Sequence, residues 1–494
     1  MQAKLLIKDE VNVKIEGLEL GTRTALVKRY KYEVPGARYQ PSVRLGRWDG
    51  KVPFFNLGGT TYINLLPEIL PYLDDQGYDI EVIDTREYRT TFEFKEVNEH
   101  SYSHIKWPKG HPKAGQSMEL RDYQPEIINR FFANPQCVQE VATGAGKTVI
   151  TAALADGVSP YGRTIVIVPN KSLVTQTETD FVNMELDAGV YFGDRKEYNR
   201  THTICTWQSL NNLLKNTKND EAEITIGEFL EGVVAVIVDE VHQAKADALK
   251  TLLSGPFAHI PIRWGLTGTI PKEQYEYTSI FCMIGPVVGQ LSARELQEAG
   301  HLALCHVNVV QMLDHVEYKD YQSELKYLVT NIDRIKYIAQ LISKIKEGGN
   351  TLILVDRVET GKLLQIELSN LFSLLKDKPD VAFVSGSTKA AERKEHYDEV
   401  AEASNKIIIA TYGVAAVGIN IPRIFNLVLI EPGKSFVRVI QSIGRGIRKA
   451  EDKDFVQIWD ITSTCKFAKR HLTKRKAFYK EANYPFTVEK AEWQ

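Results

Sequence analysis

The chain has 494 residues, of which 43% are hydrophobic and 25% are charged, and its formal net charge is −2. This length is too great for one hydrophobic core, so about two to four domains are expected. The composition is typical of a soluble globular protein. The small net charge excludes nucleic-acid binding through the field of the whole molecule, so such binding would need a local basic surface.

The five cysteines are scattered and form no Cys-x-x-Cys pair, which argues against a metal or disulfide framework. The first residues contain no signal-peptide core. No apolar run approaches the roughly 20 residues that span a bilayer. We therefore expect a cytoplasmic protein without a membrane partner.

Residues 1–100 are predicted to form a small α+β domain, with strands at 4–7, 11–15, 80–82 and 88–94 and a helix at 66–73. Basic and aromatic residues alternate within 23–51, among them Arg44, Arg47 and Trp48. This mixture suits a nucleic-acid backbone with stacked bases, although a solvated basic face over core aromatics is an equal alternative. Residues 101–117 contain prolines and glycines and are predicted to be a linker.

From residue 118 onward, apolar strands alternate with helices, which predicts parallel sheets. Buried-strand runs occur at 164–169, 233–238 and 263–269, and again at 351–355, 381–384, 406–410 and 427–430. The pattern predicts an α/β domain at 118–300, a connector at 301–335 and a second α/β domain at 336–465. Residues 466–494 are predicted to be a basic C-terminal tail with a solvated helix face.

Residues 141–148 read Val-Ala-Thr-Gly-Ala-Gly-Lys-Thr and predict a phosphate-binding loop. The backbone of Thr143, Gly144, Ala145 and Gly146 would turn its N–H groups toward phosphate oxygens. Lys147 would bind the β- and γ-phosphates, and the Thr148 hydroxyl would ligate Mg²⁺. Val141 departs from the usual pattern, and the alternative is a glycine turn before a helix. ATP and Mg²⁺ are the predicted cofactors.

An apolar strand at 233–238 runs directly into Asp239 and Glu240. Ligands of such folds bind at the carboxyl edge of the sheet, where this strand would deliver both carboxylates. Asp239 would hold Mg²⁺ through water, and Glu240 would polarise the attacking water as general base. The alternative is a polar strand end without a function.

Two arginines, Arg445 and Arg448, are three residues apart and would share one face of a helix. Arginines near the γ-phosphate stabilise the charge that develops in phosphoryl transfer. Because both lie in the second α/β domain, they could reach the nucleotide only if the two domains closed on it.

The whole series of motifs resembles the superfamily 2 helicases of the DExH type, through residues 118–462. The resemblance implies two tandem RecA-like domains preceded by the small α+β domain. It implies that Gln124 reads adenine, that His242, Thr267, Thr269 and Gln441 couple hydrolysis to movement, and that Gly418 belongs to the nucleotide site. The segments with Gln176, Thr206 and Thr411 resemble motifs that grip a phosphodiester backbone.

A narrower resemblance is to the phage UvsW recombination helicases, carried by residues 43–52, although Leu45 stands where an aromatic is expected. It implies a monomeric, ATP-dependent DNA helicase or translocase that acts on single-stranded and branched DNA in recombination, repair or replication. The alternatives are a duplex translocase that does not separate strands, an RNA helicase, and a nucleotide-gated binding scaffold that hydrolyses nothing.

Overall fold

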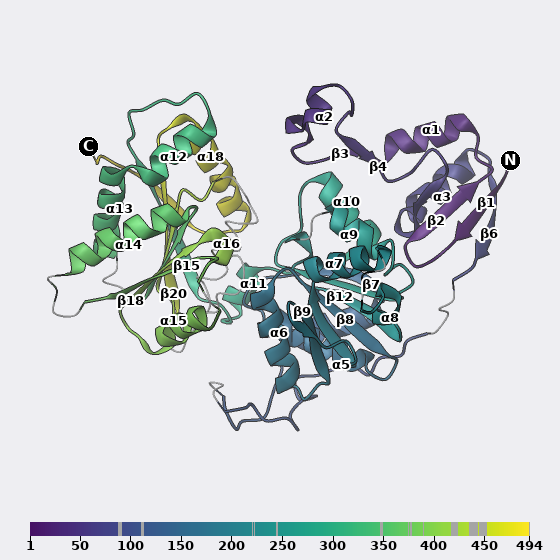
Figure 1. Cartoon of the computed structure of the whole chain (residues 1–494), viewed down its shortest axis with the longest axis horizontal. Coiled ribbons are helices and arrows are strands. Elements are labelled where there is room, and N and C mark those ends of the chain that lie inside the picture. The colour runs from purple at the N-terminus through teal and green to yellow at the C-terminus, as the bar shows by residue number, and fades with distance from the viewer. Residues whose placement is uncertain are drawn as a thin grey trace. The chain divides into compact units, whose positions relative to one another are not determined.

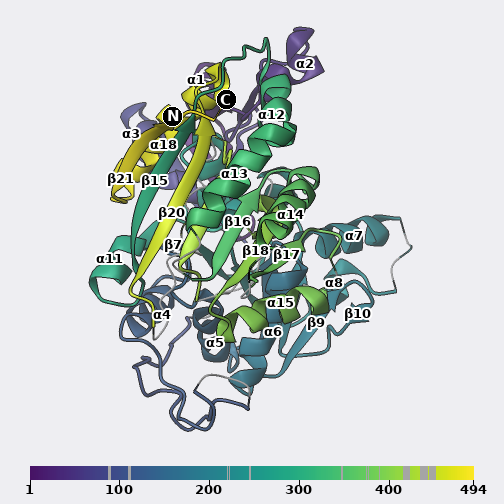
Figure 2. The same cartoon turned by 90° about the vertical axis from the view of Figure 1, so that its left-hand side faces the viewer.

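The computed structural model describes residues 1–86, 91–109, 113–219, 221, 223–243, 246–345, 349–373, 375, 378–388, 390–415, 423–433, 443 and 452–493. The chain divides into two compact units. The first contains Met1–Val141 and Gly146–Gln290, and the second contains Ala142–Ala145 and Leu291–Gln494. Figure 1 and Figure 2 show the elements of each unit.

The N-terminal α+β domain is built on a sheet of order β5-β2-β1-β6. Its strands are β1 (Gln2–Ile7), β2 (Asn12–Glu16), β5 (Thr60–Tyr62) and β6 (Asp79–Asp84). Along β1 and β2, every second side chain is buried, so one face of the sheet is apolar. The helices α1 (Leu20–Arg29) and α3 (Leu66–Asp75) pack side chains into the same core. The predicted strands at 4–7, 11–15 and 80–82 and the predicted helix at 66–73 are confirmed.

A second, two-stranded sheet of this domain carries the basic and aromatic segment. Its strands β3 (Lys31–Glu33) and β4 (Lys51–Pro53) are antiparallel, and the turns η1 (Ala37–Tyr39) and α2 (Pro41–Arg44) lie between them. Figure 1 shows α2 away from the four-stranded sheet. We call residues 31–53 the hairpin element.

The described residues of the first α/β domain form an eight-stranded sheet of order β10-β9-β11-β8-β12-β13-β7-β14. The strands are β7 (Gln136–Val141), β8 (Arg163–Val168), β9 (Ala188–Phe192), β10 (Arg195–Lys196), β11 (His202–Thr206), β12 (Val233–Val238), β13 (Ile262–Thr267) and β14 (Val287–Leu291). The helical segments are α4 (Gln124–Ala133), α5 (Lys147–Val158), α6 (Lys171–Asn183), α7 (Trp207–Lys218), α8 (Ile226–Phe229), η3 (Val241–Gln243), α9 (Ala246–Leu253) and α10 (Gln274–Met283). The strands from β9 to β7 pair in parallel, as predicted.

The second unit holds a seven-stranded sheet, again among the described residues, of order β17-β18-β16-β19-β20-β15-β21. The strands are β15 (Leu304–Met312), β16 (Thr351–Val355), β17 (Asp380–Val384), β18 (Lys406–Thr411), β19 (Asn426–Ile430), β20 (Phe455–Ser463) and β21 (Phe486–Ala491). The helices are α11 (Ala293–Glu298), α12 (Tyr321–Thr330), α13 (Ile332–Ile345), α14 (Val358–Phe372), α15 (Ala390–Glu402), α16 (Tyr412–Ala415) and α18 (Lys466–Glu481). All its pairings between neighbouring strands are parallel.

The two large sheets repeat one topology. Taken in chain order, β7, β8, β9, β11, β12 and β13 occupy the positions that β15, β16, β17, β18, β19 and β20 occupy in the second sheet. The fold is therefore two tandem parallel-sheet domains preceded by a small α+β domain, which confirms the predicted fold class.

The second domain extends beyond the boundaries predicted for it. Residues 301–335, expected to be a connector, supply β15 and α12, and β15 pairs with both β20 and β21. Residues 466–494, expected to be a tail, supply α18 and β21. Arg475 and Tyr479 of α18 are buried and bind the buried Asp460 carboxylate. Only part of α18 is solvated, because its other face completes the core.

The segment that joins the N-terminal domain to the first α/β domain is packed rather than extended. Phe94 stacks on Phe132 with ring centroids 4.5 Å apart, and Phe92 lies edge-on to Tyr161 at 5.2 Å. Of the strand predicted at 88–94, residues 91–94 form no strand because their aromatic side chains pack on helix and loop surfaces instead, and 88–90 lie outside the described residues. In the predicted linker, the Tyr102 hydroxyl donates to Asp156 at 3.2 Å.

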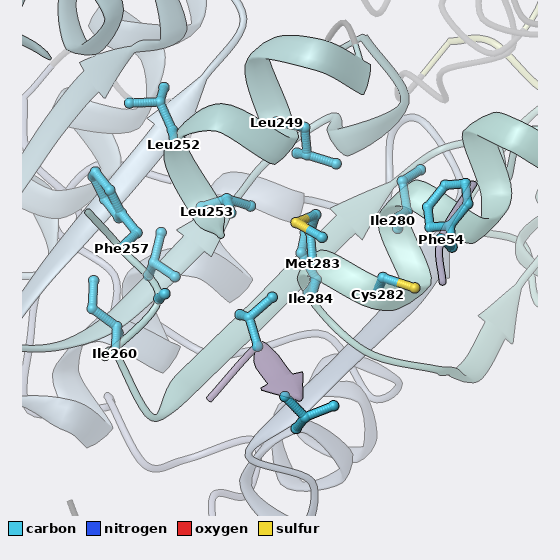
Figure 3. Close-up of a cluster of buried hydrophobic side chains, with 14 of the residues drawn as sticks. Phe54, Leu249, Leu252, Leu253, Phe257, Ile260, Ile280, Cys282, Met283 and Ile284 are labelled. Carbon is cyan, nitrogen blue, oxygen red and sulfur yellow. The ribbon is translucent and has the colours of Figure 1, made fainter. Parts of the chain in front are cut away.

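The N-terminal domain shares one hydrophobic core with the first α/β domain. Phe54, which follows β4, lies beside Ile280 and Cys282 of α10 in Figure 3, and its ring meets Tyr275 edge-on at 5.9 Å. The Lys250 ammonium lies 3.9 Å from the centre of the Phe54 ring. The two domains are therefore fixed to each other by apolar burial and a cation–π contact.

We expect Phe54→Ala to loosen the N-terminal domain from α10. The side chain is 1% exposed, and truncating a buried phenylalanine costs about 3–5 kcal/mol. Native-state hydrogen exchange of the β1 and β2 amides should report a lower free energy of opening. Leu45→Ala is the control, because Leu45 is 65% exposed. Unchanged protection in the Phe54 variant would show that the N-terminal domain does not depend on this core.

Candidate active site

The predicted phosphate loop joins the end of β7 to the start of α5. Gly144 and Gly146 have φ values of 93° and 79°, a backbone region that side chains with a Cβ rarely adopt. A Cβ atom on Gly146 would also lie 2.6 Å from the Gln124 amide nitrogen. Both glycines are therefore required by geometry. The loop delivers the N-terminus of α5, whose N–H groups and dipole favour anions.

Lys147 and Glu240 form the central ion pair of the site. The Lys147 ammonium lies 2.9 Å from a Glu240 carboxylate oxygen, and both side chains are 9% exposed. The ammonium also donates to the Val141 carbonyl at 3.4 Å. The ion pair brings the loop after β7 and the end of β12 together, although 92 residues lie between Lys147 and Glu240 in the sequence.

Glu240 has a strained backbone, because its φ is 49° and it is not a glycine. Its amide donates to the Asp239 carboxylate at 2.8 Å. Such outliers persist only where surrounding contacts impose them, and they gather at functional sites. Here the turn aims the Glu240 carboxylate at Lys147.

Asp239 is 2% exposed at the carboxyl end of β12. Burial raises the pKa of its carboxyl, the neighbouring Glu240 charge raises it further, and Lys147 opposes both effects. A cation bound beside Asp239 would lower that pKa and keep the carboxylate ionised.

One residue of the site was not predicted from the sequence. The Thr148 hydroxyl donates to the carboxylate of Asp180, which lies on α6. The pKa of Asp180 is raised to about 6, because burial raises it more than the hydrogen bond from Thr148 lowers it. In the sequence, the feature that could have identified Asp180 was an acidic residue on the helix face that also holds the buried residues Val174, Thr177 and Phe181.

Three of the four predicted coupling residues, His242, Thr267 and Thr269, lie together where β12 and β13 end. The His242 ring nitrogen Nδ1 lies 2.5 Å from the Thr267 hydroxyl and 3.5 Å from Glu240. The Thr267 hydroxyl donates to the Thr269 carbonyl at 2.8 Å. The buried Thr269 hydroxyl has no hydrogen-bond partner within the described part of the chain. A chain of contacts thus connects Glu240 to the loop after β13.

Gln124 begins α4 and is 3% exposed. Its side-chain oxygen accepts the Arg121 amide at 2.9 Å, and its nitrogen faces Gly146. Thr143 and Ala145 lie in the loop itself, where the Ala145 amide donates to the Ala142 carbonyl. The structure thus brings Gln124 to the phosphate loop, and adenine recognition stays a prediction.

The predicted nucleic-acid contacts are less uniform. Gln176 on α6 and Thr411 at the end of β18 are half-buried. Thr206 is buried, and its hydroxyl accepts the Ser209 amide as the N-cap of α7. That side chain therefore serves the helix in this structure, and its contact with nucleic acid stays a prediction.

Four predicted residues, Gly418, Gln441, Arg445 and Arg448, lie outside the described residues. Their roles at the nucleotide stay predictions.

In the hairpin element, Arg44 and Arg47 are exposed and Trp48 is half-buried. Tyr39 is 70% exposed, with the Arg38 guanidinium 4.8 Å from its ring centre. By contrast, Tyr30, just before the element, is buried in the core. The core alternative thus describes Tyr30, whereas Tyr39 faces solvent, and contact of this segment with nucleic acid stays a prediction.

Comparisons with known proteins identify related families and relatives. Two family models match, "Type III restriction enzyme, res subunit" over residues 117–272 and "Helicase conserved C-terminal domain" over residues 333–450. The ATP-dependent DNA helicase uvsW of Enterobacteria phage T4 is 25% identical over 98% of this chain and 95% of its own length. The DNA 3'-5' helicase XPB of Kineococcus radiotolerans is 22% identical over 76% of this chain and 65% of its own.

Among solved structures, the DUF1998 helicase MrfA bound to DNA matches the fold with a TM-score of 0.58 and 12% identity, over 81% of this chain and 53% of that one. The fold and the site define an ATP-dependent helicase. Both family matches and the order of the motifs are similar to those of superfamily 2 helicases, and the chain is similar to the phage UvsW helicase over nearly its full length.

We expect Glu240→Gln to bind ATP but to hydrolyse it about 10²–10⁴-fold more slowly, because an amide cannot act as the general base. The amide oxygen can still accept from Lys147, so the loop should keep its shape. Nucleotide affinity and steady-state ATPase rate are the two measurements. Lys147→Ala is the comparison and should lose both. Loss of binding in the glutamine variant would assign Glu240 a structural role.

We expect Asp180→Leu to raise the Mg²⁺ concentration for half-maximal ATPase about 2- to 10-fold, the range that the loss of one hydrogen bond of 0.5–1.5 kcal/mol produces. Asp180→Asn keeps an acceptor for the Thr148 hydroxyl and should change this Mg²⁺ concentration less. Thr179→Ala, at an exposed position of α6, is the matched control. Equal behaviour of the leucine and control variants would exclude a positioning role for Asp180.

Proposed function

We propose that this protein is an ATP- and Mg²⁺-dependent DNA helicase or translocase that acts on branched DNA, by unwinding or branch migration, in recombination, repair or replication. The relatives named above are DNA helicases, which supports DNA as the substrate. The single observation that carries the branched-DNA proposal is the hairpin element, a basic and aromatic surface fixed to the domain that holds the phosphate loop.

In the proposed reaction, Lys147 exchanges partners. In the structure its ammonium pairs with Glu240. The β- and γ-phosphates of ATP would attract the ammonium, and Glu240 would then be available to polarise the attacking water. His242 contacts both Glu240 and Thr267, so this change at Glu240 would be transmitted to the loop after β13.

The side chains beside the phosphate loop fit a magnesium ion. Thr148, Asp239 and Asp180 offer hydroxyl and carboxylate oxygens, which Mg²⁺ prefers. When bound, the ion would neutralise charge on the phosphate oxygens. Thr148 would bind it directly, Asp239 would hold its waters, and Asp180 would orient the Thr148 hydroxyl.

The hairpin element supplies the groups that a junction requires. Arg38, Arg44 and Arg47 are exposed and can contact phosphates, while Tyr39 offers an exposed ring for a base. Because Phe54 anchors β4 in the shared core, force on this element would be transmitted to the first α/β domain. Contacts between DNA and an element fixed in this way would keep the bound DNA in place while a strand moves.

The shared core also determines how the proposal is tested. Deleting residues 1–100 would expose the apolar side chains of α9 and α10, so surface substitutions in the full chain are preferable. We expect Arg44→Glu with Arg47→Glu to weaken binding to a four-way junction about tenfold or more, while the ATPase rate without nucleic acid stays unchanged. The control, Lys8→Glu with Lys95→Glu, makes the same charge change at exposed positions outside the element.

The measurements are junction affinity and the ATPase rate with no nucleic acid, single-stranded DNA, duplex DNA, a junction and single-stranded RNA. Stimulation that is greatest with the junction and lost in the hairpin variant supports the proposal. Equal stimulation by plain duplex would indicate a duplex translocase, and stronger stimulation by RNA would indicate an RNA helicase. Equal loss in the control variant would remove the hairpin element from the argument.

A further inference from the structure

The repeated topology places a second ligand position in the second α/β domain. In the first domain, the phosphate loop follows β7, and the loop that contains Thr269 follows β13. The strands β7 and β13 are neighbours in the sheet. The equivalent strands of the second domain are β15 and β20, which are also parallel neighbours. Ligands of open parallel sheets bind outside the carboxyl ends of the strands, so the segments after β15 and β20 are where a ligand is expected.

A cavity of about 700 Å³ opens at this position. Residues Asp314, His315, Val316 and Glu317, which follow β15, line one side. The other side is formed by Thr464, Cys465 and the first two turns of α18, with Lys466, Lys469, Arg470 and Thr473. The cavity therefore occupies, in the second domain, the place that the nucleotide site has in the first.

The described lining of this cavity is cationic. Lys466, Lys469 and Arg470 are exposed and repeat at the spacing of one helix face. Of the two lining carboxylates, Asp314 is buried and paired with the Arg334 guanidinium at 3.3 Å. Glu317 is the other lining carboxylate, and it is exposed. The described lining therefore has three exposed cationic side chains and one exposed carboxylate.

The floor of the cavity is rigid. The Ser463 hydroxyl donates to Asp314 at 2.5 Å and accepts the Cys465 amide at 3.0 Å. The buried Glu324 of α12 accepts the amides of Phe467 and Ala468 at 3.1 and 2.7 Å. These contacts fix the start of α18 and hold the three cationic residues at one place.

The segment after β15 cannot cradle a nucleotide as the phosphate loop does. It reads Leu-Asp-His-Val-Glu at 313–317 and contains neither a glycine turn nor a Gly-Lys-Thr sequence. Cationic side chains, rather than backbone N–H groups, are what this position offers. Such groups bind phosphate charge without activating it for hydrolysis.

We infer that the cavity between the segment after β15 and the start of α18 is a phosphate-binding site that holds the backbone of the bound nucleic acid, through Lys466, Lys469 and Arg470. The inference rests on the proposed function, because it assumes that the protein binds nucleic acid. It assigns to the second domain a contact outside the helicase motifs described above.

The test compares two triple variants of α18 in the full chain. One changes Lys466, Lys469 and Arg470 to alanine, and the other changes Lys474, Lys476 and Lys480, which are outside the described cavity lining. Each removes three positive charges from one helix. Affinity for single-stranded DNA is measured across salt concentrations, because each phosphate contact contributes about 0.7 to the log–log slope.

We expect the cavity variant to lose about 0.7 to 2 from that slope, the equivalent of one to three phosphate contacts, while the control variant keeps the wild-type slope. Equal loss in both variants would mean that the general charge of α18 is responsible, and no loss in the cavity variant would also overturn the inference. If the wild-type protein binds no nucleic acid at all, the proposed function itself fails.

Tripolyphosphate distinguishes the two sources of phosphate. Thermal stabilisation of the wild type, but not of the cavity variant, by tripolyphosphate together with an unchanged DNA slope would assign the cavity to a free anion and overturn the nucleic-acid assignment. Competition between tripolyphosphate and DNA that is lost in the cavity variant supports the inference.

Discussion

The buried pair of Lys147 and Glu240 is the interaction on which the active site depends. Two opposite charges with little exposure stabilise one another, and removing either partner leaves an uncompensated charge at a cost of about 3–5 kcal/mol. The pair holds the phosphate loop against the end of β12 and positions the strained turn at Glu240. The same turn brings Glu240 near His242, which in turn contacts Thr267 at the end of β13.

The same strand order serves two purposes in this chain. In the first α/β domain, the carboxyl edge of the sheet carries glycines, a buried lysine and paired acids, which together suit hydrolysis. In the second, the equivalent edge carries a buried Arg334–Asp314–Glu431 cluster and the cationic start of α18. A parallel sheet offers a ligand position at this edge in both cases, and the loop residues decide which chemistry takes place there.

The N-terminal domain is part of the first compact unit, because Phe54 and its neighbours share a core with α9 and α10. The Asn12 amide also donates to the Ser254 carbonyl at 2.8 Å, and that of Asn64 donates to Phe281 at 2.8 Å. These polar contacts fix the orientation that the apolar core alone would leave free. The hairpin element is therefore attached to the first α/β domain. No helix within the described ranges is long and apolar enough to cross a membrane.

Local sequence patterns predicted the buried strands such as 233–238, the glycine turn of the phosphate loop, and the order of motifs that resembles superfamily 2 helicases. These follow from side-chain periodicity and backbone sterics, which act over a few residues. The hydrogen bond between Thr148 and Asp180, and the completion of the second domain by β15 and α18, depend on the tertiary structure. Such contacts join residues that are far apart in the chain. Because packing selects them, no local sequence pattern predicts them.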